Sequence, residues 1–262
     1  MQNKQPIGIF DSGIGGTSIW KEIVALLPFE NTIYLADSAN APYGVKSKEE
    51  IIQLCIKNTE ELLNANAKII VVACNTATTN AIRYLRNTYD VPFIGIEPAI
   101  KPAALQSKTK VIGVLATKGT LTSDLFAKTS EHLTTHISIL EAEGTGLVEL
   151  IEDDKIDSLM TFNLLKSYLK PLVKADIDHL VLGCSHYPFL IPVLKKIVPD
   201  EVTIIDSGEA VAKQTKNILK TNDLINNKVI PKYLFYTNGN PVILERMLSF
   251  SSLPKKIVQK AF

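Results

Sequence analysis

Two short segments place a cysteine at the end of an apolar run that suits a buried strand. The segment "VVACNTAT" carries Cys74 and the segment "LVLGCSHYP" carries Cys184, each followed by polar residues. With Asn75 or Thr76 as an N-cap, Cys74 stands at a helix N-terminus, where a thiol has a lowered pKa. A free cysteine is also commonly a small buried hydrophobe, so neither residue is decisive alone. Cys55 lies in a helical apolar pattern and is expected in a helix core.

Two further residues could assist these thiols. Asp11 lies in "FDSGIGGT", where glycines permit tight turns and a close approach of the backbone to a ligand. This segment is neither the dinucleotide fingerprint nor the phosphate-binding loop, and Asp11 could simply cap the turn. His186 follows Cys184 by two residues. It could carry a proton, pair with a charge, activate Cys184 as a nucleophile or lie on the surface.

An internal repeat relates the two cysteine segments. "IGIFDSGIGGT" resembles "IGVLATKGT", and "IIVVACNTAT" resembles "HLVLGCSHYP", at nearly equal offsets of 105 and 110 residues. Two similar lobes would each present one cysteine from an equivalent strand end, so two thiols would flank one cleft. A hydrolase or transferase needs one nucleophile. A racemase needs one group to remove a proton from one face of a carbon and another to deliver a proton to the opposite face.

The elements that must position these residues alternate between strands and helices. This alternation predicts an α/β fold of two pseudo-symmetric Rossmann-like lobes with mostly parallel sheets and the active site between them. The predicted lobes are 1–97 plus 209–262, and 98–208. The predicted strands are Ile7–Phe10, Thr32–Ala36, Ile69–Ala73, Phe93–Ile96, Val111–Ala116, Ile137–Glu141, His179–Leu182, Val202–Ile205 and Lys232–Tyr236. The predicted helices are Thr17–Leu27, Lys48–Asn64, Thr76–Thr88, Leu121–Leu133, Leu159–Lys174 and Ala210–Thr221.

Composition narrows the functional classes. The 262 residues are 46% hydrophobic with a net charge of +1, which supplies a core but no electrostatic attraction for nucleic acid or an anionic membrane. Neither a membrane-spanning run nor an apolar signal segment is evident, so a cytoplasmic location is expected. Three cysteines without a CxxC pair favour neither a disulfide framework nor a structural zinc site.

Three other segments carry weaker signals. "NAPYG", with Tyr43 and Gly44, could hold a carboxylate or be an ordinary turn. "ATKGTLTS" supplies hydroxyls at a strand end, or a helix N-cap. "LVELIEDDKID" offers several acids, including Glu152, although such a charge run is usually a solvated helix end.

Seven segments in this order resemble the glutamate racemases of the cofactor-independent aspartate/glutamate racemase superfamily. They are "IGIFDSGIGG", "YLADSANAPYG", "VVACNTAT", "GIEPAIKPA", "GVLATKGT", "LVLGCSHYP" and "IIDSGEAVA", and they span nearly the whole chain. The resemblance implies interconversion of L- and D-glutamate, supplying D-glutamate for peptidoglycan, without pyridoxal phosphate or metal. It also implies a homodimer. The chain has no long N-terminal extension of the kind linked to activation by a cell-wall precursor, so that regulation is not expected.

The resemblance also implies site residues. Cys74 and Cys184 would exchange protons with the substrate, assisted by Asp11, Glu152 and His186. The implied substrate-binding residues are Asp11, Ser12, Tyr43, Gly44, Asn75, Thr76, Thr117, Thr120, Thr122, Ser185 and His186. Two departures stand out, since the family commonly has Thr at position 185 and a "VPLIE" pattern where this chain has "VELIE".

Three other functions compete with this interpretation. Aspartate racemases typically have Glu at the position of His186, which favours the glutamate branch. A thiol hydrolase or transferase would use Cys184 and His186 only, and would tolerate replacement of Cys74. A binding protein with the same two lobes would show affinity without exchange of the α-proton.

Overall fold

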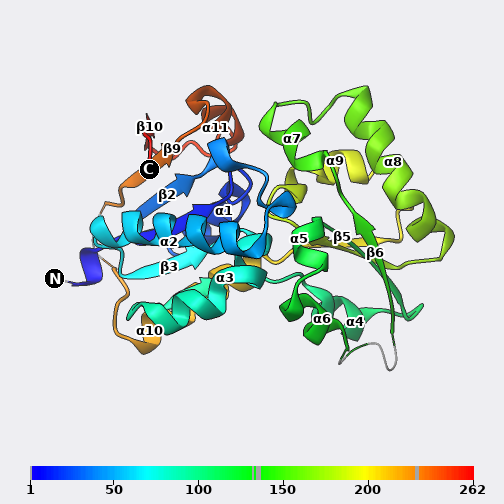
Figure 1. The fold of residues 1–262 in the computed structure, drawn as a ribbon, viewed down its shortest axis with the longest axis horizontal. Coiled ribbons are helices and arrows are strands. Elements are labelled where there is room, and N and C mark those ends of the chain that lie inside the picture. The colour runs from blue at the N-terminus through cyan, green and yellow to red at the C-terminus, as the bar shows by residue number, and fades with distance from the viewer. Residues whose placement is uncertain (1, 132, 134–136, 228–229) are drawn as a thin grey trace.

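The computed structural model describes residues 2–131, 133, 137–227 and 230–262, which form two parallel sheets flanked by helices (Figure 1). The first sheet has the strand order β10-β9-β2-β1-β3-β4 and the second the order β6-β5-β7-β8. The strands are β1 Ile7–Asp11, β2 Thr32–Ala36, β3 Ile69–Val72, β4 Phe93–Gly95, β5 Val111–Ala116, β6 Ser138–Glu143, β7 His179–Gly183, β8 Thr203–Ile205, β9 Tyr233–Thr237 and β10 Lys255–Gln259. The predicted α/β class with mostly parallel sheets is confirmed.

The repeat seen in the sequence reappears as a shared strand order. The run β2-β1-β3-β4 of the first sheet matches β6-β5-β7-β8 of the second, so β1 corresponds to β5 and β3 to β7. The C-terminal strands β9 and β10 extend the first sheet beyond β2. The central strands β1, β3 and β7 are buried throughout, which is typical of parallel sheets covered on both faces. The lobe boundaries at 97/98 and 208/209 stay a prediction.

Helices form the crossover connections between the parallel strands, and several begin with an N-cap residue. They are α1 Thr17–Leu26, α2 Lys48–Asn64, α3 Asn75–Thr88, α4 Ile100–Gln106, α5 Lys118–Leu121, α6 Asp124–Glu131, α7 Leu147–Glu152, α8 Leu159–Lys174, α9 Ile191–Leu194, α10 Gly208–Thr221 and α11 Pro241–Met247. In α2, Ser47 accepts from the Glu50 N–H while the Glu50 carboxylate accepts from the Ser47 N–H, a complete capping box. Within the described ranges, no helix combines the length and apolar character needed to cross a bilayer.

The sequence-based element assignments need three corrections. The helix predicted over Leu121–Leu133 is divided into α5 and α6, because the Ser123 side chain accepts the N–H of Phe126 and starts a new helix; residue 132 lies outside the described residues. The N-cap of α3 is Cys74 itself, not Asn75 or Thr76. The predicted helices and strands do not include α4, α7, α9, α11 and β10, because these elements are only four to seven residues long.

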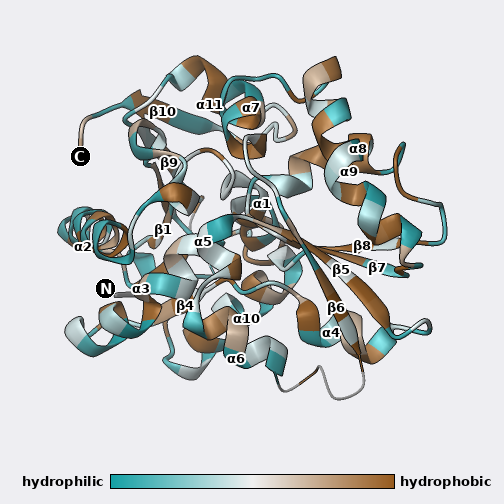
Figure 2. Cartoon of the chain, turned by 45° about the vertical axis from the view of Figure 1, so that its right-hand side comes forward, coloured by the Kyte–Doolittle hydropathy of each residue, from teal (hydrophilic) through white to brown (hydrophobic). Residues whose placement is uncertain are grey.

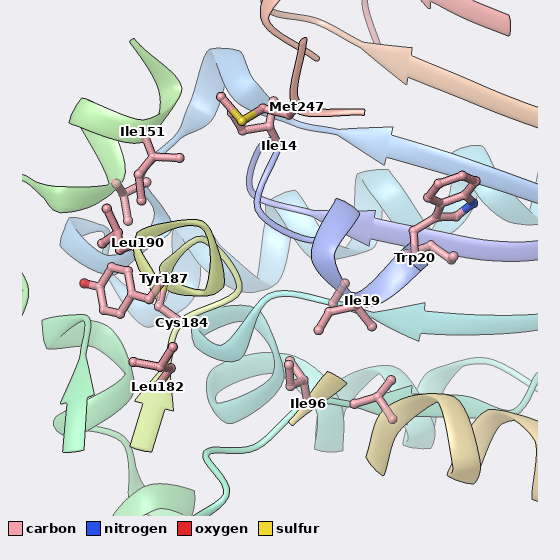
Figure 3. Close-up of a cluster of buried hydrophobic side chains, with 14 of the residues drawn as sticks. Ile14, Ile19, Trp20, Ile96, Ile151, Leu182, Cys184, Tyr187, Leu190 and Met247 are labelled. Carbon is pink, nitrogen blue, oxygen red and sulfur yellow. The ribbon is translucent and has the colours of Figure 1, made fainter. Parts of the chain in front are cut away.

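The largest buried apolar cluster joins the two sheets. It includes Ile14 after β1, Ile151 in α7 and Met247 in α11, which Figure 3 labels together with Cys184. Figure 2 shows how hydrophobic and hydrophilic residues are distributed, with hydrophobic strands inside and hydrophilic stretches on the outer helices. Because burial of this cluster removes apolar surface of both sheets from water, it fixes the strand ends of one sheet against those of the other.

Candidate functional site

Both cysteines at strand ends line a single cavity between the two sheets. Cys74 follows β3 and Cys184 follows β7, and their side chains are nearly buried. The cavity is lined by Ser12, Pro42, Tyr43, Gly44, Cys74, Asn75, Thr76, Thr117, Val148, Cys184 and His186. These residues come from the carboxyl ends of strands in both sheets, which is where ligands bind in open parallel sheets.

The space inside this cavity is very small. Its volume is about 10 Å³, which holds no more than about one water molecule. A second hollow of about 30 Å³ adjoins it and shares Pro42, Gly44, Thr117 and Val148 with it. An amino acid is larger than either space, so the residues that line them must move apart before a substrate of that size enters.

Cys184 lies beside a buried histidine, which in turn contacts a partly buried carboxylate. The Cys184 Sγ lies 3.9 Å from His186 Nδ1, and the other ring nitrogen, Nε2, lies 2.7 Å from Glu152 Oε1. The same Glu152 oxygen accepts the backbone N–H of Ile14 at 2.7 Å. Burial alone would lower the pKa of His186, but its bonds to Cys184 and Glu152 and the charge of Asp11 outweigh this and hold that pKa well above 6.5. The imidazole beside Cys184 is therefore stabilised in its cationic form.

Asp11 lies between the two cysteine sides and is fully buried. Its carboxylate accepts the Ser185 hydroxyl at 2.9 Å and the Gly13 N–H at 3.1 Å, and it lies 4.0 Å from His186 Nδ1. Burial raises the pKa of Asp11 above its usual value, an effect that His186 and these hydrogen bonds oppose. The positively charged neighbour that Asp11 faces is His186.

The pKa of Cys74 is shifted in the opposite direction from the one predicted. Cys74 is indeed at the start of α3 and accepts the N–H of Ala77 at 3.4 Å, while its thiol lies 3.6 Å from Ser12 Oγ. However, burial raises the pKa of Cys74 well above its ordinary value, and Asp11 raises it further. The prediction of a lowered pKa is wrong here because desolvation outweighs the helix terminus. Cys74 is therefore held as a thiol.

Polar side chains at the start of α3 and around α5 also meet beside the cavity. The hydroxyls of Thr76, Thr117 and Thr120 form a triangle with separations of 2.8, 3.1 and 3.3 Å. Asn75 is nearly buried, lines the cavity, and has no hydrogen-bond partner for either amide atom within the described structure. An unsatisfied buried amide is costly, so its position points to a polar ligand.

Two predicted binding residues differ from expectation in their geometry. Tyr43 lines the cavity with Gly44, but its hydroxyl donates to Asp37 at 2.5 Å and so is directed away from any ligand. Thr122 is exposed, and its hydroxyl donates to the Lys118 carbonyl at 3.0 Å, so the structure does not bring it to the cavity. The other predicted site residues are brought together.

Sequence reasoning overlooked three residues at this site. Pro42 and Val148 line the cavity, and Asp37 accepts the hydrogen bond from the Tyr43 hydroxyl. A carboxylate directly after β2, at the same sheet edge as Asp11, is a signal that could have identified Asp37.

Comparisons with known proteins agree on one family. Residues 7–215 match the family model Asp/Glu/Hydantoin racemase. A glutamate racemase of Ectopseudomonas mendocina is 43% identical over 91% of this chain and 91% of its own. Among solved structures, Escherichia coli glutamate racemase with L-glutamate and the activator UDP-MurNAc-Ala has a TM-score of 0.86 at 29% identity, covering 98% of both chains. Glutamate racemase from Francisella tularensis in complex with D-glutamate has a TM-score of 0.84 at 28% identity, covering 99% of this chain and 98% of its own.

Proposed function

This chain belongs to the Asp/Glu/Hydantoin racemase family, and on that premise we propose that it interconverts L- and D-glutamate by proton transfer between two thiols. The observation that carries the proposal is that Cys74 and Cys184, from corresponding strand ends of the two sheets, line the same cavity. The glutamate named for the two structural neighbours supports the choice of substrate.

The proposed reaction moves one proton off Cα and another onto its opposite face. A thiolate on one side takes the α-proton, the electron pair spreads into the α-carboxylate, and the thiol on the other side protonates Cα. The two sulfurs have then exchanged protonation states, so the reaction is balanced without an external oxidant or reductant. The burial of the side chains around the cavity helps, because it limits the access of water to a very weakly acidic carbon.

Neighbouring groups assign a different environment to each thiol. The cationic His186, held by Glu152, lies beside Cys184, so its positive charge is placed to stabilise negative charge that forms on that sulfur during proton transfer. Burial and Asp11 keep Cys74 as the thiol. One thiolate and one thiol are what the first step of a two-base racemisation requires.

The proposed substrate contacts follow from the cavity walls. Asn75 has amide atoms free to bind a carboxylate or ammonium, and opening the cavity would release the threonine hydroxyls for the same purpose. The proposed binding set is Asp11, Ser12, Tyr43, Gly44, Asn75, Thr76, Thr117, Thr120, Ser185 and His186. The family resemblance further supports a cytoplasmic homodimer that uses no cofactor and supplies D-glutamate for peptidoglycan.

Deuterium incorporation at Cα, followed by NMR in D₂O, tests the proposal. The parent should exchange the α-proton of both L- and D-glutamate with no added cofactor. Cys74→Ala and Cys184→Ala should each lower racemisation by about 10²- to 10⁴-fold, because each removes a general acid–base group. Exchange with aspartate alone would move the substrate to the sister activity. Full activity in Cys74→Ala would favour single-thiol chemistry. If neither glutamate nor aspartate incorporates deuterium at Cα, the racemase proposal is refuted.

A further inference from the structure

A second buried carboxylate lies behind the cavity rather than in it. Asp37 directly follows β2 and is 0% exposed. Side chains from four segments converge on it: Asn40 at 2.8 Å, Tyr43 at 2.5 Å, Lys57 and Asn58 at 3.5 Å, and Asn238 at 2.5 Å. A buried carboxylate with this many donors is held in one orientation.

The contact with Tyr43 connects Asp37 to the cavity. The Tyr43 hydroxyl donates to Asp37 and accepts from Asn58 Nδ2 at 3.0 Å, so both its donor and acceptor roles are used. Burial, the neighbouring Cys55 and the charge of Asp37 raise the pKa of Tyr43 well above 10, so the hydroxyl stays protonated and continues to donate. The ring of Tyr43 is therefore fixed at its polar end by Asp37.

The segment that Tyr43 begins is also packed tightly against the second sheet's side of the cavity. Tyr43–Val45 forms a single 3-10 turn that contacts α5. A Cβ on Gly44 would meet Thr117 at 2.8 Å, and one on Gly119 would meet the Gly44 carbonyl oxygen at 3.1 Å. Movement of Tyr43 would therefore shift Gly44 and Thr117, two residues that line the cavity.

The C-terminal segment supplies the anchor on the other side of Asp37. Asn238 follows β9, donates to Asp37, and accepts the backbone N–H of Ala39 through its side-chain oxygen at 2.9 Å. Its own N–H donates to the Ala36 carbonyl. The returning C-terminal chain thus fixes both the carboxylate and the turn that follows it.

We propose that Asp37 is a positioning residue, which, anchored by Asn238, holds Tyr43 and so sets the 42–44 segment against the substrate. This inference rests on the proposed function for its substrate. It predicts that loss of the carboxylate weakens glutamate binding even though Asp37 does not touch the cavity.

The test compares Asp37→Asn with Glu30→Gln. Asparagine keeps the shape of Asp37 but loses one acceptor oxygen, so either Tyr43 or Asn238 loses its partner. Glu30 is a buried carboxylate of the same lobe, paired with Lys68 at 2.6 Å, and neither residue lines the cavity. We expect the KM for glutamate to rise roughly 10- to 100-fold in Asp37→Asn, as for loss of a charged hydrogen bond, and to stay at the parent value in Glu30→Gln.

Tyr43→Phe and a binding measurement complete the experiment. If Asp37 acts through the hydroxyl, Tyr43→Phe reproduces the rise in KM, and the double variant is no worse than Asp37→Asn. Calorimetric titration with D-glutamate measures the same contrast as a binding affinity, because the two enantiomers have equal enthalpies and their interconversion adds no heat. A parent that binds glutamate but does not racemise it refutes the proposed function alone. An unchanged KM and affinity in Asp37→Asn, or an equal loss in Glu30→Gln, would overturn the positioning role.

Discussion

Replacing Glu152 by Gln removes the charge behind His186 while keeping the side chain's shape. In the structure one Glu152 oxygen accepts both from His186 Nε2 and from the Ile14 N–H, each at 2.7 Å. The amide oxygen of Gln can accept both N–H groups at the same position, but it offers no negative charge to the imidazolium. Because the bond to Glu152 is one of the causes that raise the pKa of His186, this pKa must fall in the variant.

The size of the effect follows from the charge that is lost. A hydrogen bond to a charged group contributes about 1.5–3 kcal/mol and one between neutral groups about 0.5–1.5 kcal/mol. This difference of about 1–1.5 kcal/mol should lower kcat/KM roughly 5- to 13-fold at neutral pH if the cationic His186 is used in the transition state. Since the pKa of His186 decreases, the alkaline limb of the pH–rate profile should also move to lower pH. The acidic limb should be less affected, because His186 is protonated there in both proteins.

Circular dichroism at a series of pH values gives kcat and KM in both directions. The two enantiomers have equal free energies, so kcat/KM must fall by the same factor from L- and from D-glutamate whatever the mechanism. The primary isotope effect with α-deuterated substrate need not change equally. It should increase more in the direction in which Cys184 takes the α-deuteron, because Cys184 is the one of the two thiols that lies beside His186.

Asp153→Asn is the matched control, since it removes the same charge one residue along the chain from an exposed side chain. This variant should keep the parent's rate and pH profile. If Glu152→Gln has the same kcat/KM and alkaline limb as Asp153→Asn, the assignment of Glu152 as the partner that charges His186 is refuted.

Two further predictions concern the cavity walls. Asn75→Ala removes an amide that is buried without partners in the described structure. The free energy of unfolding, measured in urea, should therefore stay equal or rise by about 1 kcal/mol, while the KM for glutamate increases. A clear loss of stability would contradict this prediction. Gly15→Ala places a Cβ on the His186 ring, so the ring must change its position relative to Cys184, and kcat should fall about 10²-fold, as for a displacement near 1 Å. Unchanged kinetics would show that the ring position is not critical.

Much of this architecture is encoded locally, and the sequence therefore predicts it well. Continuous apolar runs such as Ile69–Val72 specify strands buried on both faces, and polar residues directly after them mark the strand ends. The repeated order of strands and cysteines predicts that Cys74 and Cys184 reach the same edge from two similar sheets. These inferences hold because period and strand-end chemistry depend on neighbours in the chain.

Tertiary packing alone decided how the side chains act on one another. Glu152 looked like part of a solvated charge run, yet it reaches His186 34 residues away because α7 packs against the first sheet's glycine turn. Asp37 lies in one of the segments that carry the family resemblance, and one of its contacts comes from Asn238, 201 residues later. The sequence predicted a lowered pKa for Cys74, whereas burial raises it. Distances and desolvation depend on which elements meet across the core, and no local pattern contains them.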